Sequence, residues 1–334
     1  MKTTFKVAAV ATAGVLALTG CSSASSEGGN SLNLVGYSVL EQANAGVIQA
    51  FQDTSAGKGV EFKESYGASG DQSRAVAAGQ DADEVHLSLE PDVTRLVDEG
   101  IVAKDWKDND TQGICTQSIV VMVVKPGNPK HITSWSDLTK PGVGIVTPNP
   151  ASSGSAKWNL LAAYGSVLAD GGSESDAQSY MKDFFSNVVA LPDSGRDATT
   201  AFTNGTGDVL LSYENEAILA RQNGTDFDYV IPDSSILIQN PCALTTDASA
   251  GAKAFMAFQK SEQGQKLYAE TGYRPLMDVG NVPVKGANDE SNPFPEPKKL
   301  LTIDDDFGGW DEANTKFFDE NDGILTKIQA EAGQ

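Results

Sequence analysis

Three short turns place a serine beside a glycine at a point where a helix is predicted to begin. They are Ala68-Ser69-Gly70, Ser153-Gly154-Ser155 and Ser194-Gly195-Arg196. The first N–H groups of a helix have no partner within the helix, and the helix dipole adds roughly half a positive charge there. Glycine admits a ligand close to the backbone, and a serine hydroxyl either caps the helix or donates to the ligand. One such turn is an ordinary helix cap, but three on one chain predict a binding site for a compact anion.

A site made only of N–H and O–H donors selects among anions. A protonated anion brings a donor of its own, and leaving that proton unpaired costs about 1–3 kcal/mol. The turns therefore favour a fully ionised, sulfate-like oxyanion over protonated phosphate. Phosphate would need a carboxylate acceptor, for which Asp71 and Asp193 are the candidates near these turns.

The overall charge opposes anion binding at long range. The 334 residues include 24 Lys and Arg against 45 Asp and Glu, which gives a net charge of −21. This field is screened beyond about 8 Å at physiological ionic strength, whereas the dipoles of helix ends act at contact. The same charge argues against a nucleic-acid partner, because a phosphate backbone is bound by a basic surface.

The sequence offers no residue set for catalysis or metal binding. The two histidines, His86 and His131, have no partner at the spacing of a metal site or a catalytic triad. Ser179 and Lys182 match an S-x-x-K motif, but they stand alone in a predicted amphipathic helix. We therefore expect no enzymatic activity, no metal and no cofactor.

The first 31 residues are typical of a lipoprotein leader and tether. Lys2 and Lys6 precede an apolar run too short to span a bilayer, which predicts a signal peptide over residues 1–20. The sequence Leu18-Thr-Gly-Cys21 matches a lipoprotein cleavage site, so that Cys21 would become the lipid-bearing first residue. Residues 21–31 would form a flexible tether at the outer face of the cell membrane. The alternative is an ordinary secretory signal with an incidental cysteine.

Two cysteines remain, Cys115 and Cys242. An exported chain with two such residues favours one disulfide, and the alternative is a pair of buried thiols.

Segments with strand and helix patterns alternate along the rest of the chain, which predicts α/β units on mostly parallel sheets. The predicted strands span residues 32–37, 60–64, 84–89, 118–124, 143–147, 188–191, 208–213, 229–231 and 243–246. The predicted helices span 41–55, 92–99, 176–187, 197–203, 214–223 and 249–261, besides those that begin at the first two turns. A further amphipathic helix is expected from about Asp311.

In these segments and their order the mature chain resembles the periplasmic sulfate-binding proteins of ABC importers, including the thiosulfate-binding branch. The stretches that carry the resemblance are residues 67–76, 141–143, 147–159, 193–195, 207–217, 272–275 and 307–310. The resemblance implies a type II periplasmic-binding-protein fold of two lobes, each a mostly parallel sheet flanked by helices, with the ligand in the cleft between them. Lobe 1 would comprise 32–114 and 245–334, and lobe 2 would comprise 115–244. A monomer that delivers its anion to permease subunits is also implied.

The resemblance also implies which residues bind the anion. In the family, backbone N–H groups at helix starts bind sulfate, helped by one serine hydroxyl and one tryptophan N–H. Carried onto this chain, Ser153 matches the hydroxyl donor and is followed by backbone donors. The residues expected at the site are Ser38, Ser69, Ser153, Gly154, Ser155, Arg196 and Tyr213.

Four of these residues depart from the family pattern and leave the identity of the anion open. Tyr213 stands where the family has tryptophan, and Ser155 stands where it has a second glycine. Arg196 replaces a small residue and would add positive charge, while Ser38 stands where an aspartate usually contributes its N–H. Thiosulfate, molybdate, tungstate and phosphate are therefore alternatives to sulfate. A surface-anchored enzyme acting on sulfated or phosphorylated substrates and a sensor or adhesion scaffold are the alternatives from other classes.

Overall fold

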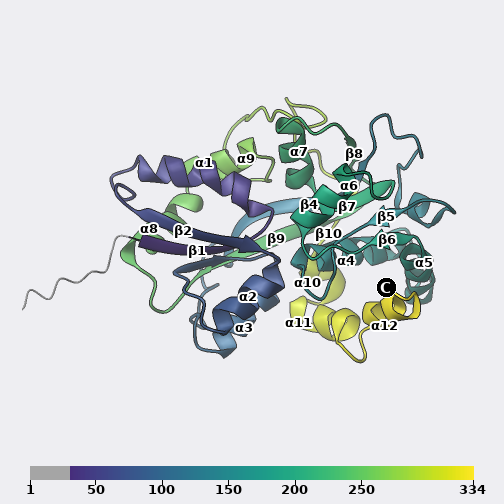
Figure 1. Ribbon diagram of the computed structural model, residues 1–334, viewed down its shortest axis with the longest axis horizontal. Helices are drawn as coiled ribbons and strands as arrows, with labels where there is room; N and C mark the ends of the chain where they lie inside the picture. Colours follow the sequence, from purple (N-terminus) through teal and green to yellow (C-terminus); the bar gives the residue numbers. More distant parts are fainter. Residues whose placement is uncertain (1–30) are drawn as a thin grey trace, which may run out of the picture.

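The computed structural model describes residues 31–334, in which two lobes share two long strands (Figure 1). The sheet order is β2-β1-β3-β9-β4-β7-β5-β6, with β8 beside β4 and β10 beside β9. The strands are β1 (Ser31–Tyr37), β2 (Glu61–Gly67), β3 (Glu84–His86), β4 (Ile114–Val124), β5 (Ile145–Val146), β6 (Val188–Ala190), β7 (Val209–Tyr213), β8 (Asp228–Val230), β9 (Ser234–Leu244) and β10 (Lys299–Leu301).

The helices are short and lie on both sides of these strands. They are α1 (Leu40–Gln52), α2 (Ser69–Ala77), α3 (Glu90–Asp98), α4 (Gly154–Ala169), α5 (Glu174–Ser186), α6 (Gly195–Thr203), α7 (Glu214–Gln222), α8 (Ala250–Gln259), α9 (Glu262–Glu270), α10 (Ile303–Phe307), α11 (Trp310–Ala313) and α12 (Ile324–Glu331). Two single turns, at Trp135–Thr139 and Asn314–Phe318, complete the regular structure of the described residues.

The first lobe is built on β1, which pairs in parallel with β2 and β3. The second lobe is built on β5, which pairs in parallel with β6 and β7. Antiparallel strands β4 and β9 run between the lobes: β9 pairs with β3 near one end, and β4 pairs with β7 near the other. The predicted fold of two mostly parallel α/β lobes joined by crossing strands is confirmed.

Cys115 on β4 and Cys242 on β9 lie side by side on these crossing strands. Their Cα atoms are 5.7 Å apart, and the structure joins them as a disulfide. Both side chains are buried. The bond therefore ties the two connecting strands together at the end that borders the first lobe.

Helix α4 is the central helix of the second lobe and is buried on nearly all of its faces. A helix that is apolar all round lies in a core rather than at a surface. Here α5, β7, β9 and β10 all contact α4. The N-terminus of α4 nevertheless faces the first lobe, because Gly154 lies against Ser88 and Leu89. The core of the second lobe therefore fixes the helix end that borders the space between the lobes.

The C-terminal segment corrects the predicted lobe boundaries. Strand β10 pairs with the part of β9 at Ser234–Ile236, and α12 packs against α5 (Figure 1). Residues 299–331 therefore belong with the second lobe, and their assignment to lobe 1 within 245–334 is wrong. Leu325 and Ile328 form the buried stripe of α12. A buried stripe of this kind predicts a helix, but it does not indicate against which lobe the helix packs.

The predicted signal peptide, Cys21 and all of the tether except Ser31 lie outside the described residues. Among residues 31–334, no helix has both the length and the apolar character needed to cross a membrane.

Candidate functional site: a cavity between helix ends

A small cavity lies where the starts of α2, α4 and α6 meet the end of β1. The space that it leaves for a water-sized group is only about 10 Å³. Five of the seven predicted binding residues line it, namely Ser38, Ser69, Ser153, Gly154 and Ser155. The other lining residues are Tyr37, Val39, Gly67, Ala68, Ser88 and Gly195. No carboxylate is among them, so the wall presents hydroxyl groups and helix-terminal N–H groups to the interior.

The turn before α4 leaves its first N–H groups available. Ser153 is the N-cap residue, but its side chain does not cap the helix. Its Oγ atom instead lies 2.9 Å from Oγ of Ser155. In α6, by contrast, the Ser194 hydroxyl accepts from the N–H of Asp197. That cap occupies the third helical N–H and leaves those of Gly195 and Arg196 without an intrahelical partner.

Ser69 can offer an anion only its backbone N–H, because its hydroxyl already donates one hydrogen bond and accepts another within the protein. Its Oγ donates to Oδ2 of Asp92 at 2.6 Å and accepts from the N–H of Ser88 at 2.9 Å. These bonds fix the turn before α2 against the loop that follows β3. The Asp92 carboxylate therefore holds the wall of the cavity without lining it.

Ser38 differs from the expectation that its N–H faces the anion. This N–H donates to the carbonyl of Gly67 at 2.8 Å, which continues the parallel ladder between β1 and β2 by one residue. The half-buried Ser38 lines the cavity, so its hydroxyl is the group that it can offer.

Tyr213 is at the site but acts through another residue. It is fully buried and does not line the cavity. Its hydroxyl lies 2.6 Å from Oγ of Ser88, which does line the cavity. Burial raises the pKa of the Tyr213 phenol well above its usual value, so it remains protonated and able to donate. Ser88 was missed by the sequence analysis, although its position after a parallel strand is the usual place for a ligand contact.

The Arg196 side chain does not add a free positive charge to the cavity. Its Nε atom lies 2.9 Å from Oε1 of the buried Glu216, which compensates the guanidinium. Nη2 of Arg196 also approaches the Val39 carbonyl of the first lobe at 3.5 Å. The predicted increase in charge is thus wrong, and the side chain instead links the two lobes.

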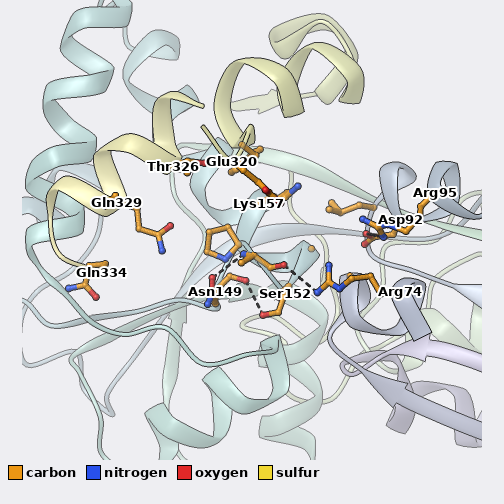
Figure 2. A pocket seen from close by; sticks show the side chains of 18 residues that line it. Arg74, Asp92, Arg95, Asn149, Ser152, Lys157, Glu320, Thr326, Gln329 and Gln334 are labelled. Carbon is orange, nitrogen blue, oxygen red and sulfur yellow. Dashed lines mark hydrogen bonds and ion pairs between the residues drawn. The ribbon is translucent and has the colours of Figure 1, made fainter. Parts of the chain in front are cut away.

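The lobes touch directly around the cavity. The N–H of Gly70 in α2 donates to the carbonyl of Ser152, just before α4, at 3.0 Å. Figure 2 shows Ser152 facing Arg74 of the first lobe. Nε1 of Trp158 donates to the Ser88 carbonyl at 3.0 Å. A Cβ atom on Gly154 would lie 2.7 Å from Oγ of Ser88 and from Cγ of Leu89. Only glycine allows α4 to come this close to the opposite wall.

The described residues contain no cluster of His, Cys, Asp and Glu suited to a metal ion. The two lobes, the crossing strands and the cavity between helix ends together define a binding protein that encloses a small polar ligand. The sequence matches the family described as "Bacterial extracellular solute-binding protein" over residues 32–274. The chain belongs to this family of bacterial extracellular solute-binding proteins.

Individual relatives carry narrower names. A sulfate-binding protein of Synechococcus elongatus is 40% identical over 338 residues, covering 96% of this chain and 95% of that protein. A thiosulfate-binding protein of Pseudomonas aeruginosa is 34% identical, covering 72% of this chain and 77% of that protein. The solved structure of the sulfate-binding protein SubI from Mycobacterium tuberculosis has a TM-score of 0.81 at 44% identity, covering 86% of this chain and 99% of that chain. The predicted resemblance is confirmed, and these relatives are named as binding proteins rather than enzymes.

Proposed function

We propose that this protein captures sulfate, or its analogue thiosulfate, outside the cytoplasm and delivers it to the permease subunits of an ABC importer. The observation that carries the proposal is the lining of the cavity: hydroxyl and N–H groups without any carboxylate. Such a lining suits an anion that carries no proton. The names of the relatives support the same ligand class.

The hydroxyl donors to the anion are those whose protons are not already engaged in a hydrogen bond within the protein. The Ser153 and Ser155 hydroxyls share one hydrogen bond, which leaves one of their two protons for the anion. The Ser88 and Tyr213 hydroxyls share another, and only Ser88 reaches the cavity. We therefore assign the chain of donation from Tyr213 to Ser88 and from Ser88 to the anion.

Backbone groups supply the remaining contacts. The N–H groups of Ser69, Gly154, Ser155 and Gly195 stand at the starts of α2, α4 and α6, line the cavity and have no partner within those helices. The N–H of Arg196 is also without a partner within α6, but Arg196 itself does not line the cavity. Ser38 contributes its hydroxyl. Since these donors come from both lobes, a bound anion stabilises the closed arrangement more than an open one, and binding shifts the population toward closure.

The N-terminal segment completes the proposal. Cleavage before Cys21 and lipidation of its thiol would anchor the protein to the outer face of the cell membrane, with residues 21–31 as a tether. The binding protein would act as a monomer and without turnover.

Calorimetric titration of the purified protein with sulfate, thiosulfate, molybdate and phosphate tests this function. We expect the tightest binding for sulfate or thiosulfate. Tighter binding of molybdate or phosphate would keep the role of a binding protein but overturn the assigned ligand. Turnover of a sulfate or phosphate ester would overturn the assignment as a binding protein.

A further inference from the structure

A second, larger pocket opens directly outside the cavity, with a volume of about 360 Å³ (Figure 2). It shares Ser153 and Gly154 with the cavity, and its lining includes Gly70 and Ser152, whose hydrogen bond joins the two lobes. We call this pocket the vestibule. Helices α2 and α3 form its wall on the first lobe, and α4, α12 and the segment before α12 form its wall on the second lobe.

Three cations line the vestibule, in contrast to the acidic chain as a whole. Arg74 and Arg95 come from the first lobe and Lys157 comes from the second (Figure 2). The carboxylates in the lining are Asp92 and Glu320, and Asp71 stands just outside it, paired with Arg74, so the cations and carboxylates here balance, whereas the whole chain carries −21. The vestibule is therefore far less acidic than the rest of the chain, and it places cationic side chains beside the ligand site.

The two arginines already have carboxylate partners. Arg74 pairs with Asp71 in the same helix. Arg95 places Nη1 at 3.3 Å from Oδ1 of Asp92 and at 2.8 Å from Oγ of Ser73. These pairs hold both guanidinium groups in place at the mouth of the cleft and reduce their net charge.

Lys157 has no carboxylate partner among the ion pairs of residues 31–334. Its Nζ atom instead lies 2.9 Å from Oδ1 of Asn314 and 5.0 Å from the centre of the Phe318 ring. Burial lowers the pKa of this ammonium, and Arg95 and Arg74 lower it further while Asp92 acts in the opposite direction. A desolvated cation without an anionic partner is costly to the protein, and a visiting anion recovers that cost.

We propose that the vestibule is an outer capture site for the oxyanion, with Lys157 as its principal contact. This inference rests on the proposed function. An oxyanion arriving against the negative field of the chain is first held at Lys157, between the two lobes. It then passes Ser153 and Gly154, which line both spaces, into the cavity, where neutral donors replace the charge. The vestibule raises the rate at which the anion associates, whereas the cavity determines which anion is bound.

Stopped-flow measurement of sulfate association and dissociation tests the proposal. We expect Lys157→Gln to lower the association rate constant about 3- to 10-fold at low ionic strength, since electrostatic steering changes such rates by factors of 10 or more. The dissociation rate should stay the same, and the difference should vanish in roughly 0.5 M sodium chloride because salt screens the charge. Lys157→Arg should retain most of the rate and shows whether charge, rather than packing, is lost.

The matched control is Lys298→Gln, which removes a lysine outside the vestibule that is 77% exposed and paired with Asp233. Equal association rates in the two glutamine variants would overturn the capture site. A change confined to dissociation would also overturn it, because Lys157 would then stabilise the closed form. Absence of sulfate binding by the unmodified protein would instead reject the proposed function, so the two failures are distinguishable.

Discussion

The cavity and the vestibule lie next to each other, yet they are built from opposite kinds of group. The cavity is lined by serine hydroxyls and helix-terminal N–H groups, with no ionised side chain in its wall. The vestibule is lined by Arg74, Arg95 and Lys157, two of which are compensated by carboxylates. Fixed dipoles discriminate between anions at contact, whereas formal charges act over longer distances and are sensitive to salt. In our account the protein therefore separates the selection of its anion from the capture of that anion.

The separation depends on close contact between the lobes. Gly154 of α4 stands at the border of the two spaces and lies against Ser88 and Leu89. Substitutions on the cavity side of this border should change affinity, whereas those on the vestibule side should change the association rate.

Gly154→Ala should cause the largest loss. The added Cβ atom would lie 2.7 Å from side-chain atoms of Ser88 and Leu89, so the lobes cannot close fully. Overpacking of this kind costs about 1–3 kcal/mol, and the lost contacts between lobes add to it, so we expect affinity to fall by roughly 100-fold or more. Calorimetry with sulfate measures the loss. The control is Gly46→Ala on the exposed face of α1, where a Cβ atom meets nothing within 4 Å and affinity should not change. Equal affinities in both variants would refute the role of Gly154.

Ser153→Ala should weaken sulfate binding by about 1–3 kcal/mol, because it removes a hydroxyl donor to a charged acceptor. The paired hydroxyl of Ser155, 2.9 Å away, can rotate toward the anion and recover part of this loss. The double variant with Ser155→Ala should therefore lose more than Ser153→Ala does. An unchanged affinity in the double variant would remove both hydroxyls from the site.

Tyr213→Phe should have a smaller effect, about 0.5–1.5 kcal/mol, since the Ser88 hydroxyl remains in the cavity. In a Ser88→Ala background, the same change should cost almost nothing in affinity, because Tyr213 reaches the anion only through Ser88. The double-mutant cycle with calorimetric affinities checks this coupling. Additive losses would show that Tyr213 donates to the anion independently.

The smallest effect concerns pH and belongs to the vestibule alone. Because the pKa of Lys157 is lowered, its positive charge is lost at a lower pH than that of an exposed lysine. The association rate of sulfate should therefore begin to fall at a lower pH than the titration of an exposed lysine would bring. Lys157→Arg, whose guanidinium stays charged, should remove this fall. A fall of the same size in the arginine variant would assign it to another group.

The sequence predicts the local chemistry of the site better than its long-range pairing. The turns at Ser153-Gly154-Ser155 and Ser194-Gly195-Arg196 were identified because capping residues and glycine act within a few positions of the helix start. The bonds from Ser69 to Asp92 and from Tyr213 to Ser88 join residues 23 and 125 positions apart. No local pattern indicates such pairs, so the roles of Ser69, Ser88 and Tyr213 emerged only from the fold.

Contacts between residues far apart in the sequence also decide several helices and strands that local patterns do not reveal. The predicted strand at 243–246 is the end of the eleven-residue β9, whose earlier part was not recognised. Helix α9 was missed, since Glu262–Glu270 is polar and buries only four residues. One amphipathic helix was expected from about Asp311, but the structure has the short α11, a turn at Asn314–Phe318 and a separate α12 that begins at Ile324. The place of α12 on the second lobe follows from contacts with α5, which no local pattern specifies.

If the cavity offers donors only, sulfate and phosphate must differ in how their affinities depend on pH, which calorimetry at pH 6 and pH 8 measures. The one lining residue with an ionisable side chain is Tyr37, and burial raises its pKa well above the usual value. We expect equal sulfate affinity at the two pH values and much weaker phosphate binding, which improves at pH 8 because phosphate then carries one proton instead of two. Phosphate binding as tight as that of sulfate, with no gain at pH 8, would contradict a cavity that offers donors only.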